Sequence, residues 1–106
     1  MNLEILCTQV QELAREVGQF ILEERQKFAA EDIIHKGKTD MVTYVDKTAE
    51  ARIVTKLREL LPGSGFIAEE GTAKHNDEKY RWVIDPLDGT TNYIHGISPF
   101  AVSIAL

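Results

Sequence analysis

The sequence predicts an α+β fold in which two helices precede several short strands. Apolar residues recur at steps of three and four before Pro62, and short β-branched or aromatic runs follow Gly63. The length of 106 residues suits one folding unit, and 43% hydrophobic with 27% charged residues is a balance typical of globular chains. We therefore expect a single packed core.

The first predicted helix runs from the amino terminus to about Lys27. Its apolar positions are Leu3, Leu6, Val10, Leu13, Val17 and Phe20. Glutamate and glutamine occupy the other faces, which is the pattern of an amphipathic helix. The segment from His35 to Asp40 is polar, contains a glycine and shows no period, so it predicts a loop.

The second predicted helix begins near Thr43. Thr43 and Asp46 have the spacing of a capping box, in which a threonine and an acidic side chain satisfy free backbone N–H groups. The apolar positions that continue the helix are Ala49, Ile53, Leu57 and Leu60. Pro62 and Gly63 predict its end.

Three later segments predict strands. Phe66–Ala68 and Tyr80–Ile84 are rich in aromatic or β-branched residues and are separated by a polar loop. Phe100–Leu106 has the same character and carries apolar side chains to its last residue. Because domains rarely leave such a strand uncovered, we expect a further stretch of a longer protein to cover it.

Composition and charge exclude several classes of function. Twelve basic and seventeen acidic residues give a net charge of −5, and no run rich in lysine or arginine predicts a nucleic-acid partner. The sequence shows no signal peptide and no apolar run of membrane-spanning length, so we expect no membrane partner. The single cysteine, Cys7, cannot form an internal disulfide and is expected to be a small buried side chain. These features predict a cytoplasmic protein.

Acidic residues follow two of the predicted strands. Glu69 and Glu70 come directly after the first strand, and Asp85 and Asp88 come directly after the second. Ligands of open sheets tend to lie beyond the carboxyl ends of strands, where these acids would form a cluster. Clustered carboxylates repel one another unless a cation lies between them. Oxygen donors without a histidine or cysteine pattern favour Mg²⁺, with Ca²⁺ or Mn²⁺ as competitors.

The segment that begins at Asp85 also predicts a phosphate site. Pro86 fixes a bend, and Gly89 allows the backbone to approach a ligand closely. Free N–H groups at the start of a helical turn there would face an anion. Plainer interpretations exist for each feature: Asp-Pro and Asp-Gly are ordinary turn dipeptides, and Glu69-Glu70 alone would be an exposed charge pair. Only the combination favours a phosphoryl site.

The stretch from Trp82 to Tyr93, WVIDPLDGTTNY, resembles the first signature of the inositol monophosphatase family. Lys36-Gly37 with Asp40–Thr43, then Asp46, and Phe66–Glu70 resemble further family motifs in the same order, although Ala68 replaces the usual glycine. This resemblance implies the layered α/β sugar-phosphatase fold. Residues 1–106 would be the N-terminal portion of the domain, with two helices packed on a largely antiparallel sheet. The carboxyl-terminal half, with a further metal-binding aspartate, is absent from this sequence.

The resemblance implies a role for each matched residue. Glu69, Asp85, Asp88 and the carbonyl of Leu87 would bind magnesium, with Asp85 shared between two ions. Gly89 and Thr90 would offer backbone amides to the phosphate. Thr90 and Asp46 would orient and help deprotonate the attacking water. Glu70 would lie behind the ligands, and Lys36 would lie on a loop that approaches the site.

The implied activity is that of a magnesium-dependent, lithium-sensitive phosphomonoesterase, with inositol 1-phosphate as the expected substrate and a homodimer as the state of the complete protein. Another small phosphorylated polyol or sugar, such as fructose 1,6-bisphosphate, stays open because the substrate-selecting region is absent. A truncated, non-catalytic product with partial metal binding is the alternative from a different class.

Overall fold

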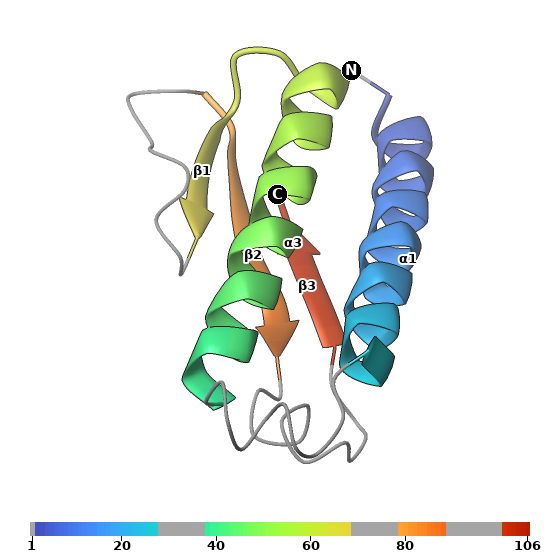
Figure 1. Cartoon of the computed structure of the whole chain (residues 1–106). Coiled ribbons are helices and arrows are strands. Elements are labelled where there is room, and N and C mark those ends of the chain that lie inside the picture. Colours follow the sequence, from blue (N-terminus) through green and yellow to red (C-terminus); the bar gives the residue numbers. More distant parts are fainter. Residues whose placement is uncertain (1, 28–37, 69–78, 89–100) are drawn as a thin grey trace.

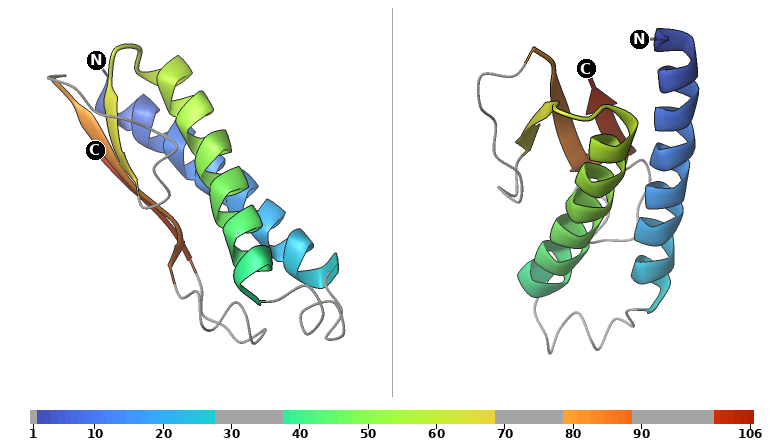
Figure 2. Two further views of the ribbon diagram at one scale, coloured as in Figure 1. Left: turned by 60° about the vertical axis from the view of Figure 1, so that its left-hand side comes forward. Right: turned by 90° about the horizontal axis from the view of Figure 1, so that it is seen from above.

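The structure is a computed structural model that describes residues 2–27, 38–68, 79–88 and 101–106. Helices α1 (Leu3–Lys27) and α3 (Lys38–Leu60) are followed by strands β1 (Gly65–Ala68), β2 (Arg81–Asp88) and β3 (Ala101–Ala105). The two helices lie side by side on one face of the sheet, and its other face carries neither (Figures 1 and 2). The expected α+β fold, with two helices packed on a sheet, is confirmed.

Helix α1 agrees with the sequence prediction. The side-chain oxygen of Asn2 accepts a hydrogen bond of 3.1 Å from the backbone N–H of Ile5, which caps the first turn. Its inward stripe is formed by Leu6, Leu13, Val17, Phe20 and Ile21, all buried. Cys7 differs from the prediction, because it lies outside this stripe and is exposed.

Helix α3 begins earlier than the sequence indicated. It starts at Lys38, so the end of the predicted loop from His35 to Asp40 is helical. Thr43 and Asp46 therefore lie inside the helix, and the capping box predicted for them is wrong. The buried apolar residues of α3 are Val45, Ala49, Ile53, Val54 and Leu57, which include three of its four predicted apolar positions. The fourth, Leu60, is partly buried against the same core.

The sheet is mixed, with the strand order β1-β2-β3. β1 and β2 are parallel, with Phe66 beside Trp82 and Ala68 beside Ile84. β2 and β3 are antiparallel, with Ile84 beside Ile104. The expected antiparallel arrangement therefore holds for β2 and β3 only, because β1 and β2 begin at the same end of the sheet.

The connection between α3 and β1 is fixed by a short hydrogen-bonded turn. The hydroxyl of Ser64 donates to the carbonyl of Leu61 at 2.7 Å and accepts from the indole N–H of Trp82 at 3.0 Å. Gly63 precedes it with a φ of 81°, a conformation that side chains with a Cβ avoid. This turn places β1 beside β2, with Phe66, Trp82 and Ile84 buried against the helices.

Two glycines are expected to respond to alanine with opposite signs. Gly63→Ala should lower the free energy of unfolding by about 1–2 kcal/mol, because alanine is strained at its positive φ. Gly18→Ala should raise it by about 0.5–1 kcal/mol, because Gly18 lies inside α1 and an added Cβ meets no atom within 4 Å. Urea unfolding of both variants measures the difference, and shifts of the same sign would contradict this account.

None of the helices in the described ranges combines the length and the apolar composition that crossing a membrane requires.

Candidate metal and phosphate site

The parallel pairing of β1 and β2 brings the ends of these strands to the same edge of the sheet. Ala68, the last residue of β1, is beside Ile84 in β2. In the sequence, Glu69 follows Ala68 and Asp85 follows Ile84. An antiparallel pair would have sent the two carboxyl ends in opposite directions. The mixed sheet therefore favours the acidic cluster that the sequence predicted.

A bulge sets the directions of the two aspartates in β2. Asp85 pairs with Ser103 and Asp88 with Ala101, so Pro86 and Leu87 together face the single residue between those partners. Pro86 and Leu87 are both buried, whereas Asp85 is half-buried and Asp88 is exposed. The extra residue interrupts the alternation of side chains, so Asp85 and Asp88 lie on the same face of the strand.

This bulge also corrects the predicted end of the strand. The sequence indicated that β2 stops at Ile84 and that a turn begins at Asp85, whereas the strand continues to Asp88. Proline lacks a backbone N–H and is tolerated in strands at bulges, which is where Pro86 lies. Both aspartates are thus held by a paired strand rather than by a free loop.

Asp85 carries an unsatisfied buried oxygen. Its Oδ1 atom is buried and has no hydrogen-bond partner among the described residues. Buried carboxylate oxygens normally have a partner, and one without a partner needs a specific explanation. A cation is the partner that an all-oxygen site would bind, and the Asp85 carboxylate fits that role.

Asp46 belongs to the helix layer. It lies in the first half of α3 and is 8% exposed. The start of α3 and the end of β2 lie at the same end of the molecule (Figure 1). Glu50, which sequence reasoning missed, lies one turn later and is fully buried. The signal for Glu50 was present in the spacing, because positions 46, 50, 53 and 57 share one helix face.

The other predicted site residues lie outside the described part of the chain. These are Lys36, Glu69, Glu70, Gly89 and Thr90. Asp85 and Asp88 are brought together on one strand face, and Asp46 belongs to the neighbouring layer. Among the described residues, no group of three metal-binding side chains assembles by itself. A complete site would therefore need the residues that follow β1 and β2.

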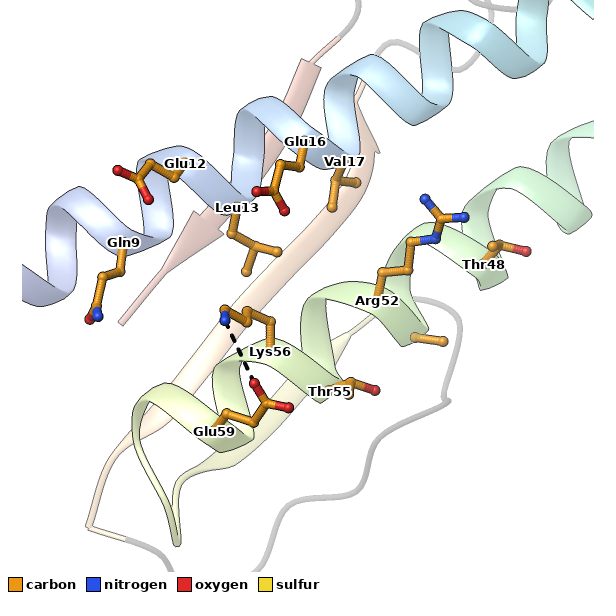
Figure 3. Close-up of a pocket in the computed structure, with 11 residues that line it drawn as sticks. Gln9, Glu12, Leu13, Glu16, Val17, Thr48, Arg52, Thr55, Lys56 and Glu59 are labelled. Carbon is orange, nitrogen blue, oxygen red and sulfur yellow. Dashed lines mark ion pairs between the residues drawn. The ribbon is translucent and has the colours of Figure 1, made fainter.

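A separate groove of 570 Å³ lies between α1 and α3 (Figure 3). Glu12 and Glu16 line it from α1, and Arg52 and Lys56 from α3. Lys56 is 3.6 Å from Glu59, but both side chains are at least half exposed, so this ion pair adds little stability. The Arg52 guanidinium covers the Phe20 ring at 4.0 Å. The groove is a charged helix seam, and none of its lining residues is a predicted site residue.

Comparison with known proteins identifies related chains. A model described as the inositol monophosphatase family matches residues 2–106. The protein named fructose-1,6-bisphosphatase/inositol-1-monophosphatase from Aquifex aeolicus is 46% identical over 89 residues, which are 84% of this chain and 34% of that protein. Nus factor SuhB from Vibrio cholerae is 44% identical over 94 residues, 88% of this chain and 35% of that protein.

Solved structures share the fold. Inositol monophosphatase from Anabaena (Nostoc) sp. PCC 7120 has a TM-score of 0.75 and 33% identity, covering 98% of this chain and 35% of that one. SaIMPase-II bound to inositol monophosphate has a TM-score of 0.69 and 30% identity, covering 94% of this chain and 34% of that one. The chain thus spans about a third of the length of the relatives it matches.

Proposed function

Because the chain belongs to the inositol monophosphatase family, we propose that it supplies the N-terminal portion of a phosphatase domain that hydrolyses inositol 1-phosphate with Mg²⁺. Residues 1–106 would hold most of the metal- and phosphate-binding groups of that domain. The observation that carries this proposal is the end of β2, where a bulge presents Asp85 and Asp88 on one face and leaves a buried oxygen of Asp85 without a partner among the described residues.

The proposed metal ligands are Glu69, Asp85, Asp88 and the carbonyl of Leu87. The pairing of Ala68 with Ile84 supports this set, because the next residue of each strand is one of these acids. All four donors are oxygens, as Mg²⁺ prefers. Bound there, Mg²⁺ would neutralise the repelling carboxylates and the phosphate charge and make water a stronger nucleophile.

Residues of the chain itself would bind the phosphate and accept the proton of the attacking water. The backbone amides of Gly89 and Thr90 would hold the phosphate oxygens, and Gly89 offers no side chain to obstruct them. Asp46 would accept a proton from the attacking water with the help of Thr90. Its position inside α3 supports this role, because a carboxylate held by a packed helix is oriented better than one on a loop. Lys36 is proposed only as a contact from the preceding loop.

The proposed substrate is a small phosphorylated polyol or sugar. The bound inositol monophosphate in the SaIMPase-II structure supports inositol 1-phosphate, and the name of the Aquifex aeolicus relative supports fructose 1,6-bisphosphate as the alternative. Both substrates present a phosphate monoester to the same proposed site, so the choice between them depends on groups that contact the leaving alcohol.

Phosphate release tests this function. We expect Mg²⁺-dependent release from inositol 1-phosphate by a complete protein of the relatives' length, with a lower rate from fructose 1,6-bisphosphate and none after removal of divalent cations. The purified chain is compared in the same assay. Metal binding by this chain without any turnover would support the alternative of a truncated, non-catalytic product.

Several relatives are named Nus factor SuhB, and these names support a second candidate role, that of a Nus factor, which would not depend on hydrolysis. A variant that cannot bind metal separates the two: loss of the cellular function with Asp85→Asn favours the phosphatase, and its retention favours the second role. Lithium inhibition, a cytoplasmic location, the absence of a nucleic-acid or membrane partner, and a homodimer of the complete protein remain predictions.

A further inference from the structure

The helix seam, the groove between α1 and α3, opens on the side of the helix layer that faces away from the sheet. All of its lining residues belong to the two helices, and no described element lies over it (Figures 1 and 2). Its floor is formed by Leu13 and Val17, which belong to the core. Thr48, Ala51 and Thr55 have short side chains, so another helix can approach α3 closely there. The seam therefore has room for a helix of another molecule.

Opposite charges line the two sides of the seam. Glu12 and Glu16 line it from α1, and Arg52 and Lys56 line it from α3; all four side chains are exposed. Among the described residues, no ion pair joins the two helices across the seam, and Lys56 instead pairs with Glu59 of its own helix. Each side of the seam thus keeps a charge that attracts an oppositely charged surface.

The guanidinium of Arg52 shows how the two sides are aligned along the seam. It lies 4.0 Å from the centre of the Phe20 ring, and Phe20 is about one helical turn after Glu16. The acids of α1 and the bases of α3 therefore lie within about one turn of each other along the helix axes, an arrangement that Figure 3 shows. A guanidinium that stacks on a ring keeps its N–H groups available to a carboxylate.

We propose that two copies of this chain pair through their helix seams, with α1 of each copy lying against α3 of the other. A two-fold axis parallel to the helices produces this arrangement and leaves each residue at the same height along the seam. Glu16 of one copy then faces Arg52 of the other, and Glu12 faces Lys56. By symmetry each contact occurs twice, so the seam is complementary in charge to a second copy of itself.

The distribution of charge also selects the orientation of the two copies. A two-fold axis perpendicular to the helices would place α1 of one copy on α1 of the other. The glutamates that line the seam would then face glutamates, and the bases of α3 would face bases. Because like charges in contact oppose association, this second orientation is disfavoured.

The area of the helix layer is close to what such a contact requires. α1 has 25 residues and α3 has 23, so each helix is about 35 Å long. Two helices of this length and about 10 Å width present about 700 Å² on each copy, against roughly 800 Å² per partner in specific interfaces. The contact is charged rather than apolar, so we expect weak pairing that depends on salt.

Analytical ultracentrifugation of the purified chain at two salt concentrations tests the pairing. We expect a monomer–dimer equilibrium at about 0.05 M salt that is weakened about tenfold or more at about 1 M, because salt screens exposed charges. A chain that stays monomeric at every accessible concentration would overturn the proposal. Pairing that strengthens with salt would also overturn it, since that result indicates an apolar contact.

Two charge reversals show whether the attraction acts between copies through the seam. Glu16→Arg alone and Arg52→Glu alone should each weaken self-association about tenfold or more, because each variant faces itself with like charges. An equimolar mixture of the two should pair, because every contact across the seam is again between opposite charges. Glu4→Arg is the control, since Glu4 is exposed on the same helix but does not line the seam. It should change association by about twofold or less.

Failure of the mixture to pair, or an equal effect of the Glu4→Arg control, would contradict pairing through the seam. Circular dichroism checks that each variant is folded, as expected for substitutions at exposed positions. Pairing through any other face would be insensitive to both reversals.

The proposal does not rest on the proposed phosphatase activity, because pairing is measured without substrate or metal. Loss of pairing in Glu16→Arg with unchanged Mn²⁺ binding would agree with both proposals. A chain that pairs as expected but binds no Mn²⁺ would count against the proposed function alone.

Discussion

Asp85→Asn is expected to weaken Mn²⁺ or Mg²⁺ binding by about 100-fold or more. Substitution of residues that only hydrogen-bond to a metal ligand already lowers metal affinity about 10- to 100-fold, and Asp85 is proposed as a ligand itself. The substitution keeps the shape of the side chain and removes its charge. It leaves a neutral amide where the proposed site needs a carboxylate shared between two ions. Phosphate release should fall with the loss of metal. Isothermal titration with Mn²⁺ measures the affinity directly.

The same substitution should not destabilise the fold. The Oδ1 atom of Asp85 is buried and has no hydrogen-bond partner among the described residues, so its charge is costly in the absence of metal. We expect the free energy of unfolding without metal to stay constant or rise by about 1 kcal/mol, as often occurs when a functional group is neutralised. Glu59→Gln is the control, because Glu59 is 65% exposed and belongs to the helix seam. Equal metal affinity in the two variants would contradict the proposed role of Asp85.

Phe66→Ala is expected to cost about 3–5 kcal/mol of folding free energy, the usual range for removing a buried phenylalanine. Phe66 is 1% exposed, pairs with Trp82 across the sheet and carries the Arg58 guanidinium 5.3 Å from its ring centre. Small domains have only about 5–15 kcal/mol of stability, so this single substitution should remove a large fraction of the free energy of unfolding. Urea unfolding followed by the fluorescence of Trp82 measures this loss.

The neighbouring residue provides the control for this loss. Ile67 belongs to the same short strand but lies on the face without helices and is 44% exposed. Ile67→Ala should therefore cost about 1 kcal/mol or less. Similar losses for both variants would mean that the sheet is not buried on the helix side alone.

The helices were predictable because their cause is local. The spacing from Leu6 to Phe20 marks the buried stripe of α1, and Pro62 with Gly63 marks the end of α3. The beginning of α3 was misplaced because Thr43 and Asp46 have the spacing of a helix cap, whereas Asp46 is a buried residue inside the helix. The same short polar pattern can occur at a helix cap or inside a helix, and only the packing of the helix distinguishes the two positions.

The direction of β1 relative to β2 and the bulge in β2 could not be predicted from the local sequence. Nothing in the residues from Phe66 to Ala68 states whether β1 runs with or against β2, since that depends on the path of the connection. Asp85-Pro86 has the composition of a turn, and its place in a strand depends on pairing with β3, distant in sequence. Long-range pairing thus decides the common face of Asp85 and Asp88, although the proposal that they are site residues came from the sequence.

The position of bound Mn²⁺ tests the central claim most directly. Mn²⁺ broadens the NMR signals of nearby nuclei, and the described chain offers two distinct acidic regions, the end of β2 and the helix seam with Glu12, Glu16 and Glu59. We predict that substoichiometric Mn²⁺ first broadens the amide signals of Ala68, Asp85 and Asp88, and that Asp85→Asn abolishes this effect. Broadening centred on the helix seam, or unchanged in Asp85→Asn, would contradict the proposed site.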